Sequence, residues 1–257
     1  MTRLNDRRTN ERAKEGKVDE TKYKQVPAMR AIGSAMLAFC VLFFAPSCVE
    51  GAQRVEQREN TSDACRELTP IDGAIFDLDE YISREWYVAQ QRVTRYQSER
   101  DLFCVRANYT LRDEKTIVIW NTATRNGVNG TMINNKGWIK LRGVLEDESV
   151  PSKLSVGLWF LPTFLYAPYW VVATDVQSDA AEFDEKGYSW AIVSGGPLDS
   201  VTADGLCVPS GGLWLFVRDP KDLQTDVVDE MKKAARALGI NTDSLTPVVQ
   251  EGCTYPQ

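Results

Sequence analysis

The sequence predicts an all-β protein, a closed antiparallel up-and-down β-barrel of eight strands with one C-terminal α-helix. Short apolar runs recur from residue 84 onward, and the segments between them are rich in Asn, Asp, Gly and Ser, the residues that turns select. Only one later stretch repeats its apolar residues at helical spacing. Eight strands are enough to close a barrel, whose interior then holds side chains or one small ligand.

The predicted strands show the alternation of a sheet with two different faces. In the second of them, Val105, Ala107 and Tyr109 fall on one face, while Arg106 and Asn108 fall on the other. A period of two residues is typical of a half-buried strand. The eight runs are Glu85–Arg92, Phe103–Arg112, Thr116–Thr122, Trp138–Leu145, Lys153–Leu161, Tyr169–Asp175, Tyr188–Gly195 and Leu213–Arg218.

The predicted helix covers Thr225–Leu238. Val228, Met231 and Ala235 recur at a spacing that places them on one face, and charged residues occupy the other. Gly239 stands where the end of a helix commonly takes a left-handed residue. We therefore expect the helix to pack its apolar face on the outside of the barrel.

The composition limits the functions that are open to the chain. Its 257 residues carry a formal net charge of -6, which argues against nucleic-acid binding because no excess of Lys and Arg is available to neutralise phosphates. There are no histidines, which excludes Ser-His-Asp catalysis, Cys-His catalysis and histidine zinc sites. We expect no catalytic residues, no metal and no cofactor.

The N-terminal segment has the parts of a targeting signal. Residues 1–28 form a hydrophilic extension, and residues 29–52 combine a short basic start, an apolar run from Ala31 to Ala45 and a small-residue exit, as secretory signal peptides do. The apolar run is shorter than the ~20 residues that a spanning helix needs. A buried helix or a short signal anchor is the alternative, and translation from Met29 is also open. Residues 53–257 then form the folded domain of a protein that is secreted or kept in the endomembrane lumen.

Four cysteines follow the signal segment. An even number of cysteines without a CxxC pair, in a chain that enters an oxidising compartment, predicts two disulfides with three possible connectivities. N-glycosylation sequons at Asn60, Asn108 and Asn129 are permitted by the same route. The cysteines are Cys65, Cys104, Cys207 and Cys253.

Three ordered motifs resemble those of the lipocalins. The first is Phe76–Tyr81 followed by Trp86, the second is Ala167–Asp175, and the third is Leu213–Pro220. With the late helix, the resemblance covers roughly residues 65–255, and three ordered motifs are far more specific than any one of them alone.

Two other segments extend the resemblance, and two depart from it. Cys104–Leu111 is similar to a second lipocalin strand, and Tyr188–Pro197 resembles the chloroplastic lipocalins of plants and algae. Ser83–Glu85 stand where the first motif usually has a glycine, and the loop Leu198–Gly212 is longer than in compact members. The departures concern local geometry.

The resemblance implies that Trp86 closes one end of the barrel and that Arg218 packs on it. A cation–π contact of about 1–2 kcal/mol would then tie the first strand to the last, where a barrel must close. The alternative is that Trp86 is one core residue and Arg218 an unrelated surface charge.

The resemblance also implies a disulfide pairing. Cys104 bonded to Cys253 would clamp the C-terminal tail across the barrel, and by elimination Cys65 pairs with Cys207. Each bridge closes a long loop, for which the chain-entropy model gives an upper figure of about 4–5 kcal/mol.

Strand alternation and the resemblance together identify candidate residues for a ligand cavity. Aromatic walls with one or two polar atoms are what an apolar ligand needs, whereas the alternative is that these side chains merely fill the barrel. The segment 162–168 is expected to guard the entrance or to contact a membrane peripherally, with core packing as the alternative. The candidate lining residues are Val88, Tyr109, Asn121, Tyr169, Val171, Trp214 and Phe216.

The function that the resemblance implies is to bind and transport or sequester a small hydrophobic ligand, such as a fatty acid, sterol, bilin or carotenoid. Protection of membranes against lipid oxidation is a further hypothesis. The competing hypothesis is a lipid- or carotenoid-modifying enzyme on a related barrel, similar to violaxanthin de-epoxidase, although the chain lacks that family's cysteine-rich segment and Glu-rich tail. The long loop after Pro197 keeps a protein-interaction module open. A plastid or vacuolar compartment is the alternative location.

Overall fold

The chain divides into two units, Met1–Gln57 and Arg58–Gln257, and every residue described here belongs to the second. The predicted extension and signal peptide lie outside the described residues. Within the described part of the chain, no helix has the length and apolar character needed to cross a bilayer. The computed structural model describes residues 65–134, 139–175, 187–224 and 226–255.

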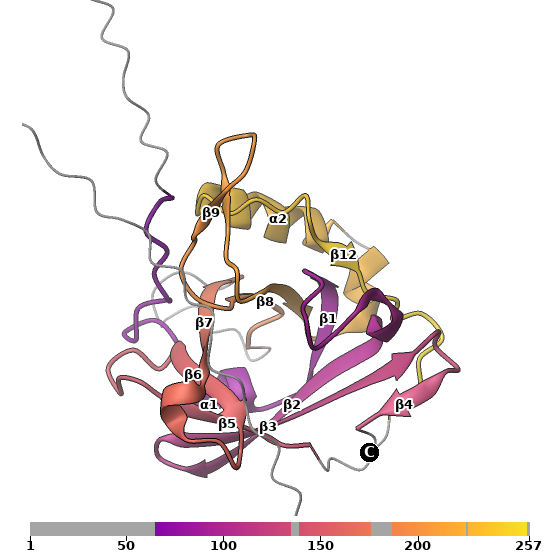
Figure 1. The fold of residues 1–257 in the computed structure, drawn as a ribbon, viewed down its shortest axis with the longest axis horizontal. Helices are drawn as coiled ribbons and strands as arrows, with labels where there is room; N and C mark the ends of the chain where they lie inside the picture. The colour runs from indigo at the N-terminus through magenta and orange to yellow at the C-terminus, as the bar shows by residue number, and fades with distance from the viewer. Residues whose placement is uncertain (1–64, 135–138, 176–186, 225, 256–257) are drawn as a thin grey trace, which may run out of the picture. The chain divides into compact units, whose positions relative to one another are not determined.

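Eight antiparallel strands close into a barrel, which confirms the predicted fold. The strands are β1 (Trp86–Gln91), β2 (Phe103–Asp113), β3 (Thr116–Arg125), β5 (Leu141–Leu145), β6 (Lys153–Leu158), β7 (Ala167–Thr174), β8 (Trp190–Ser194) and β11 (Leu213–Val217). Taken in this order, each strand pairs with the next, and β11 also pairs with β1, so that the sheet has no free edge among these eight. Figure 1 shows the strands arranged round a ring.

Many strand boundaries differ from the predicted ones by one or two residues, and three differ by three residues for local reasons. The fifth predicted run stops at Leu158 because the Leu161 N–H donates to the Leu158 carbonyl at 2.9 Å and turns the chain. The fourth begins only at Leu141, since the Asn134 side chain occupies both backbone groups of Ile139 at 2.8 Å. The third extends to Arg125, where it pairs with a short strand, β4 (Thr131–Ile133).

The predicted C-terminal helix is present as α2 (Val227–Ala237), which packs on the outside of the barrel (Figure 1). Met231 and Ala235 are fully buried against the outward side chains of β8 and β11, such as Ile192 and Leu215. A second apolar cluster lies on the inner face of the strands and contains Trp86, Val88, Val171 and Phe216 among others. The sheet therefore separates two cores, one under the helix and one inside the barrel.

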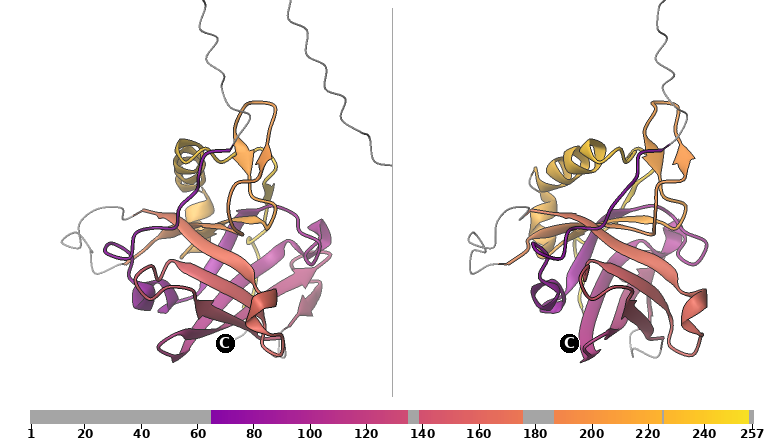
Figure 2. Two further views of the ribbon diagram at one scale, coloured as in Figure 1. Left: turned by 60° about the vertical axis from the view of Figure 1, so that its left-hand side comes forward. Right: turned by 90° about the vertical axis from the view of Figure 1, so that its left-hand side faces the viewer.

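Several short elements were not predicted. The helix α1 (Leu78–Ile82) precedes β1, and its N-cap Asp77 accepts a hydrogen bond from the Glu80 N–H at 3.0 Å. The loop Leu198–Gly212 contains a hairpin of β9 (Ser200–Val201) and β10 (Cys207–Val208), which stands away from the barrel beside α2 (Figure 2). The remaining elements are β12 (Thr246–Pro247) and the 3₁₀ helices Glu99–Asp101, Thr163–Leu165 and Pro220–Gln224.

The C-terminal tail completes the barrel wall where β1 and β2 separate. These two strands pair only at Trp86 and Tyr87, and beyond that point β12 pairs with β1 instead. The Gln250 amide then donates to the carbonyls of Val88 and Val105, at 2.9 and 2.8 Å, and so bridges the two strands.

The described residues contain two disulfides. Cys104 is bonded to Cys253, which fastens the end of the tail to the start of β2, and the two cysteines are 149 positions apart in sequence. Cys65 is bonded to Cys207, which fastens the N-terminal segment to the β9–β10 hairpin. These are the two pairs that the family resemblance implies.

Candidate binding site inside the barrel

One end of the barrel is closed by a packed floor, which we define as Phe76, Tyr81, Trp86, Tyr188 and Arg218. Trp86 is fully buried, and its indole N–H donates to the Tyr81 carbonyl at 2.8 Å. The Tyr81 ring lies 5.2 Å from the Trp86 ring, and the Phe76 ring stacks on Tyr188 at 5.8 Å. The floor thus joins α1 to β1 and to the start of β8.

Arg218 lies on Trp86, with the guanidinium carbon 3.6 Å from the ring centroid. Its N–H groups donate to carbonyls in the last turn of α1, in the segment leading into β1 and in the chain segment just before β8. Burial lowers the pKa of Arg218 to about 10, so it stays protonated at neutral pH. The acceptors are the backbone carbonyls of Glu80, Tyr81, Arg84, Glu85 and Tyr188.

The seven candidate lining residues all occupy inner-face positions of the strands, but they differ in exposure. Strand pairing places them together; for example, Val88 lies opposite Phe216, and Asn121 lies opposite the buried Ala107. Three of them belong to the buried core, and the other four are reached by solvent. Val88, Val171 and Phe216 are buried, Tyr109, Tyr169 and Trp214 are half-buried, and Asn121 is exposed.

The accessibility of inner-face residues indicates open space inside the barrel. Inward side chains that filled the interior would be buried against one another. Instead, Asn121 is exposed although it lies on the same face of β3 as the buried Ile119 and Ala123. The inner face is therefore not filled uniformly, and solvent reaches some of its side chains.

Three tyrosine hydroxyls meet at the lower end of this open space. We call Tyr81, Tyr109 and Tyr169 the tyrosine cluster; the Tyr169 hydroxyl lies 2.7 Å from each of the other two. Burial raises the pKa of Tyr109 to about 12, and burial raises the pKa values of Tyr81 and Tyr169 well above their usual value. All three hydroxyls are therefore protonated at neutral pH.

Sequence reasoning missed two residues of this region. Tyr81 comes from the short helix α1, so strand alternation gave no signal for it, although it lies in the first family motif. Gly143 faces the interior: a Cβ there would lie 3.4–3.6 Å from side-chain atoms of Ile119, Leu154 and Val156. A glycine carries no hydrophobic signal, so only its neighbours' alternation could have indicated its direction.

The opposite end of the barrel is the mouth, which we define as the connections β1–β2, β3–β5, β6–β7 and β8–β11. Since consecutive strands are antiparallel, these four connections lie at the end opposite the floor. In the β6–β7 connection, the side chains of Phe164 and Leu165 are exposed, as expected for the segment 162–168, and so are those of Trp159 and Phe160 just before it.

Tyr166, in the same segment, packs against the outside of the barrel instead of facing solvent. Its ring lies so close over Gly157 that a Cβ there would approach the ring to 2.2 Å. Its hydroxyl accepts a hydrogen bond from Arg142 Nε at 2.6 Å, and the Arg142 guanidinium lies 5.2 Å from the ring centroid. Gly157 therefore fixes where the β6–β7 connection folds.

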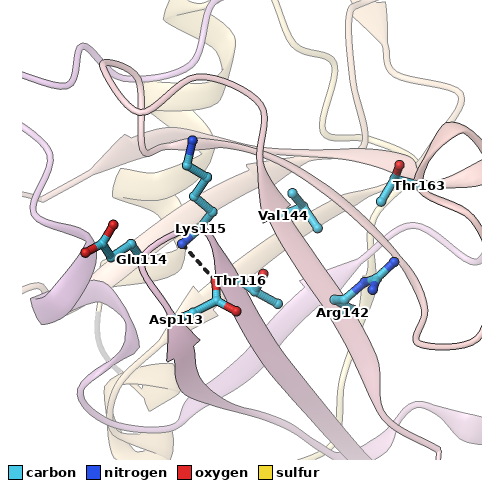
Figure 3. Close-up of a pocket in the computed structure, with 7 residues that line it drawn as sticks. All are labelled: Asp113, Glu114, Lys115, Thr116, Arg142, Val144 and Thr163. Carbon is cyan, nitrogen blue, oxygen red and sulfur yellow. Dashed lines mark hydrogen bonds between the residues drawn. The ribbon is translucent and has the colours of Figure 1, made fainter.

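A hollow of about 690 Å³ lies on the outer face of β5, beside the turn that joins β2 to β3 (Figure 3). Arg142 and Val144 contribute to it from β5, on either side of the inward-facing Gly143. This hollow is separate from the candidate lining residues, and its walls mix both signs of charge. It is lined by Asp113, Glu114, Lys115, Thr116, Arg142, Val144 and Thr163.

Residues 76–250 match the model of the lipocalin-like domain family, and the chain belongs to that family. Apolipoprotein D of Macaca fascicularis is 27% identical over 179 residues, which are 69% of this chain and 79% of that protein. Apolipoprotein D of Mus musculus is 27% identical over 178 residues, with the same coverage of both chains. Insecticyanin of the tobacco hornworm Manduca sexta is similar in structure with a TM-score of 0.44 and 17% identity, covering 75% of this chain and 92% of that one.

Proposed function

We propose that the chain binds a small hydrophobic ligand inside the barrel, above the floor, and carries or sequesters it. The observation that carries this proposal is the accessible inner face, where Tyr109, Tyr169 and Trp214 are only half-buried. An apolar ligand that covers these side chains removes their surface from water, which stabilises the complex by about 25 cal/mol per Å² before the costs of binding are subtracted. A fatty acid, sterol, bilin or carotenoid has the required chemistry.

Titration with a fluorescent polyene fatty acid tests this proposal. We expect micromolar or tighter binding, and replacing Trp214 by Ala should weaken it by about 1–3 kcal/mol because a large apolar contact is lost. Trp120 is the matched control, since it lies half-buried on the outer face of β3, where Trp120→Ala leaves the interior unchanged. Equal losses in the two variants, or none in a folded Trp214→Ala protein, would contradict the proposal.

We propose binding without turnover. The titratable groups of the tyrosine cluster are held protonated by burial, so they are poor general bases at neutral pH. Turnover of an epoxidised or peroxidised lipid by the purified protein would favour the competing hypothesis of an enzyme.

The β6–β7 connection supports a second proposal, that the mouth contacts membranes. Phe164 is 83% exposed and Trp159 is 62% exposed, and aromatic side chains of this kind partition into the interface between lipid and water. We propose that the protein protects membranes by taking up oxidised lipid at such a contact. Sedimentation with phosphatidylcholine vesicles should fall in a Trp159→Ser, Phe164→Ser variant, with Val201→Ser in the exposed hairpin as the control.

We propose that the mature protein is released into the secretory route. Two disulfides that each close a long loop are typical of oxidising compartments. N-terminal sequencing of protein from its native cell should place the first residue close to Ala52. Retention of residues 1–28 on a membrane-embedded protein would contradict this.

A further inference from the structure

The tyrosine cluster is polar, while the side chains next to it in the barrel are apolar. Tyr109 lies opposite Ile119 in the β2–β3 pair, and Tyr169 lies opposite Leu154 in the β6–β7 pair. Both Ile119 and Leu154 are buried. Hydroxyl groups in such a wall cost free energy unless they are hydrogen-bonded, so their partners need a complete account.

The three hydroxyls of the tyrosine cluster do not all donate to well-placed acceptors inside the cluster. Three hydroxyls supply three O–H donors, and among the residues that the structure describes two hydrogen bonds join them, both to the Tyr169 oxygen. The Tyr81 and Tyr109 hydroxyls also affect each other's pKa, but their contact is not one of the two well-formed hydrogen bonds, so one O–H lacks a well-placed acceptor within the cluster. Tyr81 is almost fully buried, whereas Tyr109 and Tyr169 are half-buried, so these two residues are the members of the cluster that a molecule in the interior can contact.

The charge below the cluster favours a particular kind of partner. Arg218 is protonated, and its N–H groups are used by neutral backbone carbonyls. Within the described ranges no carboxylate oxygen lies within 4.0 Å of its guanidinium. Its positive charge opposes the effect of burial on the pKa values of Tyr81 and Tyr109, so its field extends to the cluster. An electron-rich oxygen is therefore favoured there over a further donor.

We propose that Tyr109 and Tyr169, supported by Tyr81, bind the carbonyl or carboxylate oxygen at the leading end of an apolar ligand. The ligand then enters with its oxygen towards the floor and its apolar body along the upper lining. This inference rests on the proposed binding function and adds the ligand's polar group and its orientation.

Three ligands with one polyene body test the inference: retinal, retinoic acid and the hydrocarbon anhydroretinol. The wild-type protein should bind retinal roughly three- to tenfold more tightly than anhydroretinol, the effect of about one hydrogen bond. Comparison of retinal with retinoic acid then shows whether the neutral carbonyl or the carboxylate is preferred. The double variant Tyr109→Phe, Tyr169→Phe should lose the preference and keep its affinity for anhydroretinol.

Tyr188→Phe is the matched control, because the Tyr188 hydroxyl accepts from the Asp77 N–H in the floor and lies outside the cluster. This variant should keep the preference for retinal. The Raman C=O stretch of bound retinal should be lowered in the wild-type protein, and this readout needs no variant to fold.

The outcomes separate the two proposals. Failure of all three ligands to bind would contradict the proposed function itself. Equal affinity for retinal and anhydroretinol, together with an unshifted C=O stretch, would overturn the inference about the cluster and leave the binding site in place.

Discussion

The floor and the mouth of the barrel use the same residue types in opposite ways. Trp86 in the floor is fully buried, hydrogen-bonded through its indole N–H and covered by Arg218. Trp159 at the mouth is 62% exposed and meets only the edge of the Phe160 ring, at 5.9 Å, among the aromatic contacts of the described residues. Aromatic content alone therefore does not locate the stable part of this fold, whereas burial and satisfied polar atoms do.

The largest expected effect comes from removing the floor tryptophan. Trp86→Ala should lower the free energy of unfolding by about 3–5 kcal/mol, because it leaves a cavity and removes the ring on which Arg218 lies. Trp159→Ala, the same change at the mouth, should alter it by less than about 0.5 kcal/mol. Urea unfolding of both variants measures the difference, and similar losses would refute the contrast between the two ends.

Breaking the disulfides separates stability from ligand retention. Two double variants each remove one bridge: the first is Cys104→Ser with Cys253→Ser, and the second is Cys65→Ser with Cys207→Ser. Each should lower the free energy of unfolding by about 2–4 kcal/mol, since the two loops are of similar length. Only the first pair holds the tail that bridges β1 and β2, so only that variant should release bound ligand faster. Stopped-flow dissociation rates test this, and faster release from the second variant alone would contradict it.

The tyrosine cluster predicts a loss of stability at alkaline pH. Tyrosines in the unfolded chain titrate near pH 10, whereas the pKa of Tyr109 is raised to about 12 and those of Tyr81 and Tyr169 are raised as well. Above pH ~10 the unfolded state therefore binds fewer protons than the folded state, and stability falls as the pH rises, while below that value this contribution is constant.

Urea midpoints between pH 8 and pH 11.5 measure this fall. In the double variant Tyr109→Phe, Tyr169→Phe, the urea midpoint should fall less steeply with pH. An equal slope in the variant and the wild-type protein would show that other groups control the alkaline transition.

The smallest effect on stability is expected in the β6–β7 connection. Phe164→Ser and Leu165→Ser should each change the free energy of unfolding by less than about 0.5 kcal/mol, since both side chains are exposed. Gly157→Ala should cost more, because its Cβ would overlap the Tyr166 ring. Thermal melts compare the three variants, and an equal effect of all three would show that Tyr166 does not hold the connection in place.

The sequence predicted the features that depend on local patterns. Alternation along single strands placed residues such as Val88 and Tyr169 on the inner face, and the spacing of Met231 and Ala235 predicted the outer helix. Features that depend on distant partners were not predictable in this way. The Gln250 bridge between β1 and β2 and the packing of Tyr166 on Gly157 arise only when remote segments meet.

The central claim, a ligand inside the barrel, is tested most directly by two neighbouring residues of β5 that face opposite ways. Gly143→Leu places a side chain among Ile119, Leu154 and Val156 in the interior, whereas Val144→Phe enlarges one in the outer hollow. The affinity for the fluorescent fatty acid should fall roughly tenfold in Gly143→Leu and stay unchanged in Val144→Phe. Loss of binding in Val144→Phe, with wild-type affinity in Gly143→Leu, would contradict the claim and place the ligand in the outer hollow.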